Sequence, residues 1–430
     1  MNTSAQTVRG FFQQLTAQQK HGYAFAEFNI KNFRYFCTRL GRQESDQLLE
    51  HIKQTAERSI QHKGIVERVY SDTFHMLVEC PPCTPENAND TIRDSFLFQL
   101  MKDLYHIQDE HAHKQLYLSF GVIAPPDMDQ PFETLVTKAG LARKSCPYLH
   151  SHAFSYELYN DQMLQTQLRK LDLAHRLTSA RHNQEFDIYV QPKVDPRTQQ
   201  IVAGEVLMRW NNAGSTPIGA YIDLLQEFSD IYVVDRSIFQ NCCAYLSEGL
   251  KEGKPRVPLS FNISKATVGA QDFCEEYFSI VEQYQLDKSY IEFEFLENIH
   301  LTENPAAQEA LKKCHDNGYR CSLDDFGMGN SSFAFLLNGG VDCIKLDRVF
   351  FTGTLTPQRQ MLLQDLIHIA ETFNVSIVAE GVEAEEYVEF LKGTSCHCIQ
   401  GFYYYRPLPL ADFQHLLDLQ AQGHILPKLS

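Results

Sequence analysis

Charged and amide side chains recur where short apolar stretches of this chain end. Seven stretches between Glu205 and Gln400 show the pattern, at steps of about 20 to 57 residues, and each has the composition of a β-strand. An eighth stretch of this kind, FDIYVQPKVD, precedes them and contains Gln191. The polar residues are Glu205 and Arg209 in GEVLMRW, Asn262 in LSFNIS, Glu294 and Glu297 in IEFEFLEN, Asp324 and Asp325 in CSLDDFG, Lys345 and Asp347 in CIKLDR, Glu380 in SIVAEGVE, and Gln400 in CIQGF.

The carboxylates among these residues indicate metal-dependent chemistry. If Glu205, Glu294, Asp324, Asp325 and Glu380 meet at one rim, their like charges cannot all stay ionised without a cation. Oxygen ligands with one amide favour Mg²⁺, Mn²⁺ or Ca²⁺ over zinc, because no His or Cys occupies these strand ends. An adjacent Asp pair can bridge two ions, as in two-metal phosphoryl-transfer sites. The alternative for any single carboxylate is a solvated loop residue or a helix N-cap.

The elements that must position these groups are strand–helix units. The steps between the polar residues leave room for a helix before each next parallel strand. Eight such strands, with functional groups at their C-terminal ends, describe a (β/α)8 barrel whose active site lies at that mouth. The sequence therefore predicts an α/β fold with a TIM-like barrel.

The C-terminal part of the chain, from about Gln167 to Ser430, resembles the EAL domain, the cyclic-di-GMP phosphodiesterase domain of bacteria. The resemblance places a domain boundary near residue 160, with domains at 1–160 and 161–430. Each family element recurs in order and at suitable spacing. The elements are Glu205-Val206-Leu207 for the signature Glu-Ala-Leu, DDFG at Asp324 to Gly327, KxDR at Lys345 to Arg348, AEGVE at Ala379 to Glu383, and QGF…RPLP at Gln400 to Pro409.

The resemblance implies a site with two ions, Mg²⁺ or Mn²⁺, with Ca²⁺ expected to inhibit. The ligands of the first ion would be Glu205, Asn262, Glu294 and Asp324. The ligands of the second would be Asp324, Asp325 and Glu380, with Asp347 as an additional candidate.

The resemblance also implies a reaction, which is in-line attack on one phosphodiester of cyclic-di-GMP to give linear pGpG. Lys345 would position and help to deprotonate the attacking water, and Glu297 would brace the loop after the fifth strand. The catalytic set would then be Lys345, Glu205, Glu380 and Glu297. The substrate would lie near Gln191, Leu207, Arg209 and Gln400.

Two departures from the family pattern stand near the site. Val206 replaces the signature Ala, but a β-branched residue suits a strand and its side chain points away from the face of Glu205. Met328 and Asn330 stand where the family commonly has Thr and Tyr, in a loop that couples metal binding to dimerisation in relatives. We therefore expect an effect on turnover rate or on dimer coupling, with every metal ligand still present.

The first third of the chain predicts an α+β domain with the order β-α-α-β-β-α-β. It resembles the GGDEF domain, the diguanylate cyclase fold, in a degenerate form. Tyr70 and Ser71 replace the two signature glycines, which let backbone approach a nucleotide, and Thr73 replaces a catalytic Glu. Asn29 and Lys31 stand where the family has metal-binding Asp residues. We therefore expect no cyclase activity and a regulatory or dimerisation role.

The segment FSYELYNDQMLQTQLRKLDLAHRLTSARHNQEF between the two domains has helical periodicity. It would be either a connecting helix that packs on the barrel or a lever that transmits signals from the degenerate domain.

Composition bounds the remaining options. The net charge of −16 argues against DNA binding, which needs a basic face. No stretch approaches the roughly 18 apolar residues of a membrane span, and the N-terminus lacks an apolar signal core, so a cytoplasmic protein is expected. The 12 Cys fit buried thiols in a reducing compartment.

By resemblance we expect a homodimer through the barrel and possible regulation by a partner protein. Two alternatives to an active hydrolase are a non-catalytic cyclic-di-GMP receptor and an interaction scaffold.

Overall fold

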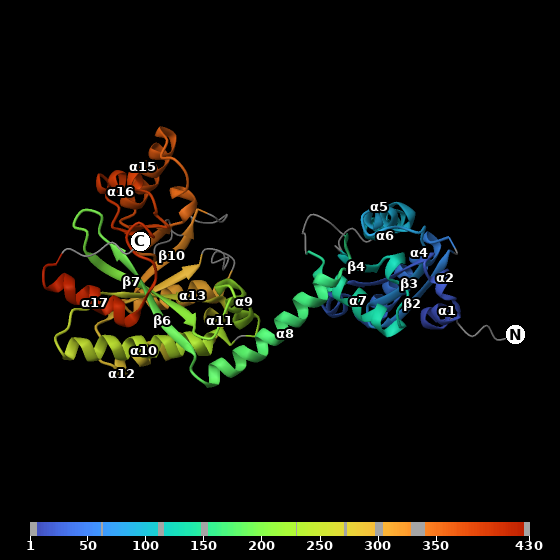
Figure 1. Cartoon of the computed structure of the whole chain (residues 1–430), viewed down its shortest axis with the longest axis horizontal. Helices are drawn as coiled ribbons and strands as arrows, with labels where there is room; N and C mark the ends of the chain where they lie inside the picture. Colours follow the sequence, from blue (N-terminus) through green and yellow to red (C-terminus); the bar gives the residue numbers. More distant parts are fainter. Residues whose placement is uncertain are drawn as a thin grey trace. The chain divides into compact units, whose positions relative to one another are not determined.

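The computed structural model of the chain describes residues 7–424, except 62, 111–115, 148–153, 229, 271–272, 297–303 and 328–339. It forms two compact units, Met1–Leu171 and Asp172–Ser430, which divide the chain within helix α8 (Asp161–His182) (Figure 1). No helix among the described residues is both long enough and apolar enough to span a membrane. The cysteines are free thiols, and most of them are buried.

The first unit is built on a five-stranded sheet in the order β2-β3-β1-β4-β5. Strands β1 to β4 pair antiparallel, and β4 pairs parallel with β5. The strands are β1 (Tyr23–Ile30), β2 (Gly64–Tyr70), β3 (Thr73–Glu79), β4 (Leu118–Ile123) and β5 (Phe154–Leu158). The main helices are α1 (Val8–Gln14), α2 (Ala17–Lys20), α3 (Phe33–Leu40), α4 (Arg42–Ser59), α5 (Ala88–Ile92), α6 (Phe98–Glu110) and α7 (Phe132–Ser145), with a π-helical turn at Arg93–Leu97.

Apolar side chains on both faces of this sheet explain why helices cover it on two sides. On one face Phe28 stacks between Phe74 and Phe120, with ring centroids 4.9 and 4.8 Å apart, in the core that α4 and α6 complete. On the other face Phe25 belongs to a separate core with residues of α1 and α7. The element order agrees with the predicted β-α-α-β-β-α-β run, to which the structure adds β5.

The prediction of a continuous helical segment from residue 154 is wrong at its start. Residues 154–158 form β5, which pairs along its length with β4, and α8 begins only at Asp161. The stretch FSYEL alternates weakly, so its pairing with a buried neighbour decides the outcome. Further along α8, Leu177 and Ala180 are buried in the core of the second unit, so the C-terminal part of the connecting helix packs on the barrel, as one of the two predicted alternatives required.

Eight strands of the second unit close into a barrel. The sheet runs in the order β13-β12-β11-β10-β9-β8-β7-β6-β14, and β13 also pairs with β6 through Ile399 and Val194. The strands are β6 (Phe186–Val194), β7 (Ile201–Trp210), β8 (Leu259–Ile263), β9 (Ile291–Leu296), β10 (Arg320–Phe326), β11 (Cys343–Leu346), β12 (Ser376–Glu380), β13 (Cys398–Gln400) and the short β14 (Leu408–Pro409).

Strand β6 departs from the expected regular (β/α)8 pattern. It runs antiparallel to both neighbours, β7 and β13, whereas β7 to β13 are parallel to one another. The short connection from Val194 to Ile201 allows only a hairpin, because a parallel crossover needs a dozen or more residues. The barrel mouth therefore receives the C-terminal ends of seven strands and the N-terminal half of β6.

Helices lie outside the barrel strands (Figure 1). Several of these helices begin at an N-cap residue. The side chain of Asn304 accepts hydrogen bonds from the backbone N–H groups of Ala306 and Ala307, and that of Thr356 accepts one from the backbone N–H of Arg359. The helices are α9 (Ile218–Glu227), α10 (Ile231–Lys251), α11 (Lys265–Val268), α12 (Phe273–Gln283), α13 (Pro305–Asp316), α15 (Pro357–Thr372), α16 (Glu385–Lys392) and α17 (Leu410–Ala421).

Candidate active site at the barrel mouth

Alternation along the strands brings the predicted polar residues together inside the mouth of the barrel. The register pairs Gln191 with Glu205, Asn262 with Glu294, and Glu380 with Gln400 across neighbouring strands. Alternate residues of each strand point into the barrel, and the register places the inward-pointing residues of neighbouring strands side by side, so they form one ring. The ring consists of Gln191, Glu205, Asn262, Glu294, Asp324, Lys345, Glu380 and Gln400.

The ammonium of Lys345 lies at the centre of this ring and contacts four carboxylates. Its Nζ lies 2.6 Å from Glu294 Oε2 and 2.6 Å from Glu380 Oε1. It also lies 3.2 Å from Asp324 Oδ1 and 3.5 Å from Glu205 Oε2. Lys345 is completely buried, so water screens none of these contacts effectively.

Charge and burial shift the pKa values of this cluster in opposite directions. Burial would raise the pKa of Glu294, but two lysines, Lys193 and Lys345, lower it to about 2. Burial raises the pKa values of Glu205 and Glu380, although Lys345 opposes that shift. Burial alone would lower the pKa of Lys345, but the surrounding carboxylates raise it well above its usual range. The site thus holds more negative charge than its two ammonium groups compensate, so the remaining carboxylates favour protons or cations.

Amide side chains surround Glu205. Asn262 Nδ2 donates to Glu205 Oε1 over 2.7 Å, and Gln400 Nε2 donates to Glu205 Oε2 and to Gln191 Oε1. Gln191 in turn donates to the backbone carbonyl of Tyr405. Among the described residues, the buried Gln400 Oε1 has no hydrogen-bond partner. An unpaired buried acceptor of this kind is ready for a ligand or an ordered water.

The Asp324–Asp325 pair sits at an irregularity of β10. The register against β11 shifts between Leu323 and Phe326, and Asp325 has φ +58°, which is unusual for a residue other than Gly. The backbone N–H of Asp325 donates to Asp324 Oδ1. Bulges and left-handed residues cluster at functional sites because they re-aim side chains. The sequence predicted the two carboxylates but not this turn of the backbone.

Other predicted site residues lie differently. Asp347 is half-buried and caps the 3-10 turn Arg348–Phe351, accepting from the N–H of Val349 over 2.8 Å. Its role as a metal ligand stays a prediction. Glu297, Met328 and Asn330 lie outside the described residues.

A hollow of about 370 Å³ adjoins the ring and contains the predicted substrate residues Leu207 and Arg209 beside Asn262. The Arg209 guanidinium lies 5.6 Å from the ring centroid of Tyr189 and donates to the carbonyl of Met208. A volume of this size is within the range of small-molecule pockets. The structure therefore places a cationic group at the wall of a cavity that opens beside the acidic ring.

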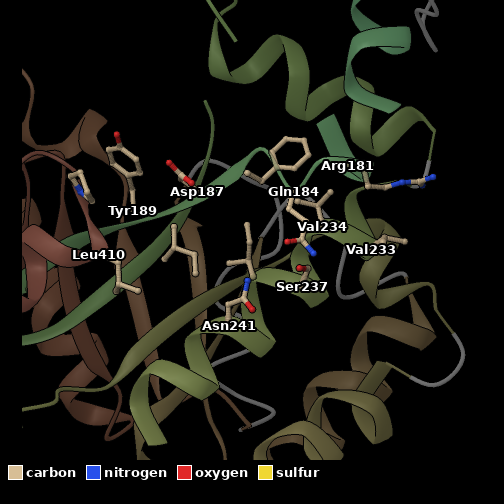
Figure 2. Close-up of a pocket in the computed structure, with 13 residues that line it drawn as sticks. Arg181, Gln184, Asp187, Tyr189, Val233, Val234, Ser237, Asn241 and Leu410 are labelled. Carbon is tan, nitrogen blue, oxygen red and sulfur yellow. The ribbon is translucent and has the colours of Figure 1, made fainter. Parts of the chain in front are cut away.

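A larger hollow of about 550 Å³ lies elsewhere, between β6, α10 and the start of α17. Figure 2 shows its lining, in which Ser237 and Asn241 of α10 face the strand that carries Asp187 and Tyr189. Asp187 is the one carboxylate among its described lining residues. The acidic ring is the better candidate site because it gathers several charged groups of opposite sign in a buried mouth.

Divalent cations fit the donor set in chemistry. Carboxylate and amide oxygens are the ligands that Mg²⁺, Mn²⁺ and Ca²⁺ prefer, and the charge excess and the unpaired Gln400 oxygen favour a cation. In the described part of the chain, however, no group of three or more His, Cys, Asp or Glu side chains is arranged to hold an ion. The carboxylates instead converge on the ammonium of Lys345.

One functional candidate, Lys193, was not predicted from the sequence. This residue is buried, and its Nζ lies 2.7 Å from Glu294 Oε1. Its two-residue offset from Gln191 in FDIYVQPKVD was the signal, since it places both side chains on one face of the strand.

The order of strands, the inward ring and the spacing of its acidic groups define a known class. The EAL domain model matches residues 174–407, more than half of the chain, and the chain belongs to this family. The model of the diguanylate cyclase GGDEF domain matches residues 6–145, so the two domains stand in tandem, as predicted.

Two similar curated proteins are cyclic di-GMP phosphodiesterase NbdA of Pseudomonas aeruginosa and biofilm architecture maintenance protein MbaA of Vibrio cholerae. NbdA is 26% identical over 402 residues, covering 92% of this chain and 50% of that protein. MbaA is 24% identical over 394 residues, covering 89% of this chain and 49% of that protein. The chain thus spans about half the length of these relatives.

Solved structures agree on the barrel. The PaMucR phosphodiesterase in complex with c-di-GMP is 25% identical with a TM-score of 0.53, over 56% of this chain and 99% of that one. The EAL enzyme Bd1971 in its cGMP-bound form is 26% identical with a TM-score of 0.55, over 59% of this chain and 71% of that one.

Proposed function

We propose that the barrel unit hydrolyses one phosphodiester bond of cyclic-di-GMP to give linear pGpG. The observation that carries this proposal is the contact of Lys345 with four carboxylates inside the mouth of an EAL barrel. The similarity to NbdA and to a phosphodiesterase solved with c-di-GMP supports the substrate.

The residues for two divalent ions, Mg²⁺ or Mn²⁺, are present. Glu205, Asn262, Glu294 and Asp324 would hold one ion, and Asp324, Asp325 and Glu380 the other, with Asp347 as an additional candidate. Bound ions would supply positive charge for the phosphate and a nucleophile at neutral pH. Ca²⁺ would occupy the same oxygen ligands and is expected to inhibit.

The chain's own groups would then divide the remaining work. Lys345 Nζ would hydrogen-bond to the attacking water and orient it once the surrounding carboxylates turn to the ions. Because Lys345 would then lose the negative field of those carboxylates, its pKa would fall toward a range in which Nζ accepts a proton. Arg209 would clamp a phosphate through its planar fork. Gln400 and Gln191 would hold Glu205 and the substrate in place through the amide chain described above.

The first unit is proposed to be non-catalytic. Thr73, at the position of the catalytic Glu, is buried and offers no carboxylate. Asn29 Oδ1 accepts a hydrogen bond from Ser119, and Lys31 brings a positive charge to the place of a metal-binding Asp. A cation in that position repels the ion that a cyclase needs. Its role would be regulation or dimerisation.

A second candidate function is a cyclic-di-GMP receptor without turnover. The observation that favours it is that Lys345 is fully buried and that the surrounding carboxylates raise its pKa well above its usual range, so that the ammonium does not accept a proton from water. A barrel locked in that state would bind the nucleotide and leave it intact.

A timed digestion of cyclic-di-GMP by the purified chain, resolved by chromatography, separates the two. Formation of pGpG with Mg²⁺ and with Mn²⁺, but not with Ca²⁺, is the expected result. Intact nucleotide with all three ions, in a folded protein that still binds it, would establish the receptor instead.

A further inference from the structure

A second buried lysine lies one layer below the acidic ring. Lys193 Nζ donates to Ser260 Oγ over 2.8 Å and to Glu294 Oε1 over 2.7 Å. Glu292 Oε1 lies farther away, at 3.9 Å. Lys193 is 2% exposed, so these neighbours on β8 and β9, rather than water, satisfy its charge.

The two oxygens of Glu294 are divided between two lysines. Lys193 contacts Oε1 from below, and Lys345 contacts Oε2 from the centre of the ring. Glu294 is fully buried, and charge-assisted hydrogen bonds of this length are among the strongest that a carboxylate makes. The Lys345 contact has to be given up when a cation takes its place among the carboxylates. The Lys193 contact does not, because Nζ of Lys193 approaches the other oxygen.

The other carboxylates of the ring are held in a different way. Glu205 is oriented by neutral amides, Asn262 and Gln400. Asp324 accepts from a backbone N–H. Among these described carboxylates, Glu294 is the one that a buried lysine, Lys193, contacts from the layer below the ring. A fixed orientation matters most there, because a buried carboxylate whose partner leaves would otherwise turn.

We infer that Lys193 is a positioning residue that holds Glu294 in the orientation that a divalent cation needs. The inference rests on the proposed function in so far as the ring is an ion site. Lys193 touches neither the substrate cavity nor the reacting atoms; it acts through Glu294. Loss of such an outer partner typically weakens metal affinity by about 10- to 100-fold.

The test uses the full chain and Mn²⁺ as the probe. Binding of Mn²⁺ without nucleotide is measured by titration calorimetry for the wild type, Lys193→Met and Glu292→Gln. Lys193→Met keeps an unbranched side chain of similar length and removes its charge. Glu292→Gln is the matched control, because it changes a charge in the same layer without contacting Glu294. We expect an affinity loss of about 10- to 100-fold for Lys193→Met and less than about threefold for Glu292→Gln.

A merely structural role predicts a different pattern. Lys193→Met would then lower the melting temperature in a chelator, while the folded fraction would bind Mn²⁺ as the wild type does. That result overturns the inference. If Lys193→Met does not fold, Ser260→Ala decides, because it removes the other hydrogen-bond partner of Nζ and leaves both charges. A smaller affinity loss in the same direction supports the inference, and unchanged affinity overturns it.

Turnover of cyclic-di-GMP, measured alongside, separates this inference from the proposed function. A wild type that binds Mn²⁺ but leaves the nucleotide intact ends the hydrolase proposal, while the affinities of the variants still decide the role of Lys193. A wild type that hydrolyses the nucleotide, with Lys193→Met equal to it in Mn²⁺ affinity, ends the inference alone. A wild type without Mn²⁺ binding overturns the inference as well.

Discussion

Lys345 Nζ and Glu294 Oε2 lie 2.6 Å apart, and both side chains are shielded from solvent inside the barrel. Removing one partner of such a buried ion pair strongly destabilises the folded protein, because the other charge is left without compensation. Here the ammonium also faces Glu205, Asp324 and Glu380. Lys345 is therefore the buried counter-cation of these four carboxylates, and the divalent cations of the proposed function would compete with it for them.

Lys345→Met should lose turnover and change how ions affect stability. In a chelator the variant should unfold more easily than the wild type, by about 3–5 kcal/mol, since the carboxylates lose their cation. Mn²⁺ should then raise its melting temperature by more than that of the wild type, because no ammonium competes with the ion. Thermal denaturation with and without Mn²⁺ measures both effects, and Lys312→Met, on the exposed face of α13, is the control. Equal melting temperatures in the chelator would contradict the counter-cation role.

Glu205→Gln should reduce kcat/KM by more than about 100-fold, a larger loss than an outer partner causes, because the substitution removes a proposed ligand directly. The amide keeps the size of the side chain, so the fold should persist. Steady-state hydrolysis of cyclic-di-GMP checks this, with the exposed Glu309→Gln of α13 as the control. Near-normal turnover in Glu205→Gln would remove this residue from the ion site.

Arg209→Lys should raise KM for cyclic-di-GMP by about tenfold, the equivalent of about 1.4 kcal/mol of binding, with a smaller change in kcat. Lysine keeps the charge but loses the planar fork that pairs with phosphate. The side chain lies at the wall of the hollow beside Asn262. A fall in kcat with KM unchanged would instead place Arg209 at the reacting phosphate.

Much of this site was predictable because strand alternation and strand ends are local properties. The spacing from Glu205 to Gln400 located seven strands, and the two-residue period then places Asn262, Glu294 and Gln400 on the inner face. Their convergence in one ring followed from barrel closure. The structure confirms the closed barrel and this gathering of side chains.

The features that escaped prediction depend on partners distant in sequence. An apolar strand pattern carries no direction, so the antiparallel course of β6 became clear only from its pairing with β7 and β13. Lys193 read as part of a strand, and its significance arises from Glu294, 101 residues away. Asp325 adopts its left-handed conformation where the register of β10 against β11 shifts. The sequence does not signal this conformation, because the residue is not a Gly.

The barrel expressed as residues 161–430 should hydrolyse cyclic-di-GMP with kcat/KM within about tenfold of the full chain, since it contains its own core and every described residue of the ring. The full chain incubated with GTP and Mg²⁺ should form no cyclic-di-GMP. Chromatography of both reactions provides the readout. A folded but inert barrel would mean that the first unit contributes to catalysis.

Asp235, which lines the hollow beside Asn262, predicts a pH dependence of stability. Burial raises the pKa of this carboxyl from 3.8 to about 7, although Thr267, whose hydroxyl lies 3.3 Å from Asp235 Oδ2, opposes the shift. The folded protein therefore holds a proton there that the unfolded chain releases above pH 4. Its contribution to stability is fully present below that pH and is lost as pH rises through about 7.

The loss is at most about 4 kcal/mol, because a pKa difference of one unit corresponds to about 1.4 kcal/mol and Asp235 keeps some access to solvent. Asp235→Asn has no proton to release, so its free energy of unfolding should change less between pH 5 and pH 8 than that of the wild type. Urea denaturation of both proteins in a chelator, at several pH values, measures the difference. The exposed Asp316→Asn is the control, since it removes a carboxylate from the surface of α13. Parallel pH profiles for wild type and Asp235→Asn would show that Asp235 is ionised in the folded protein throughout this range.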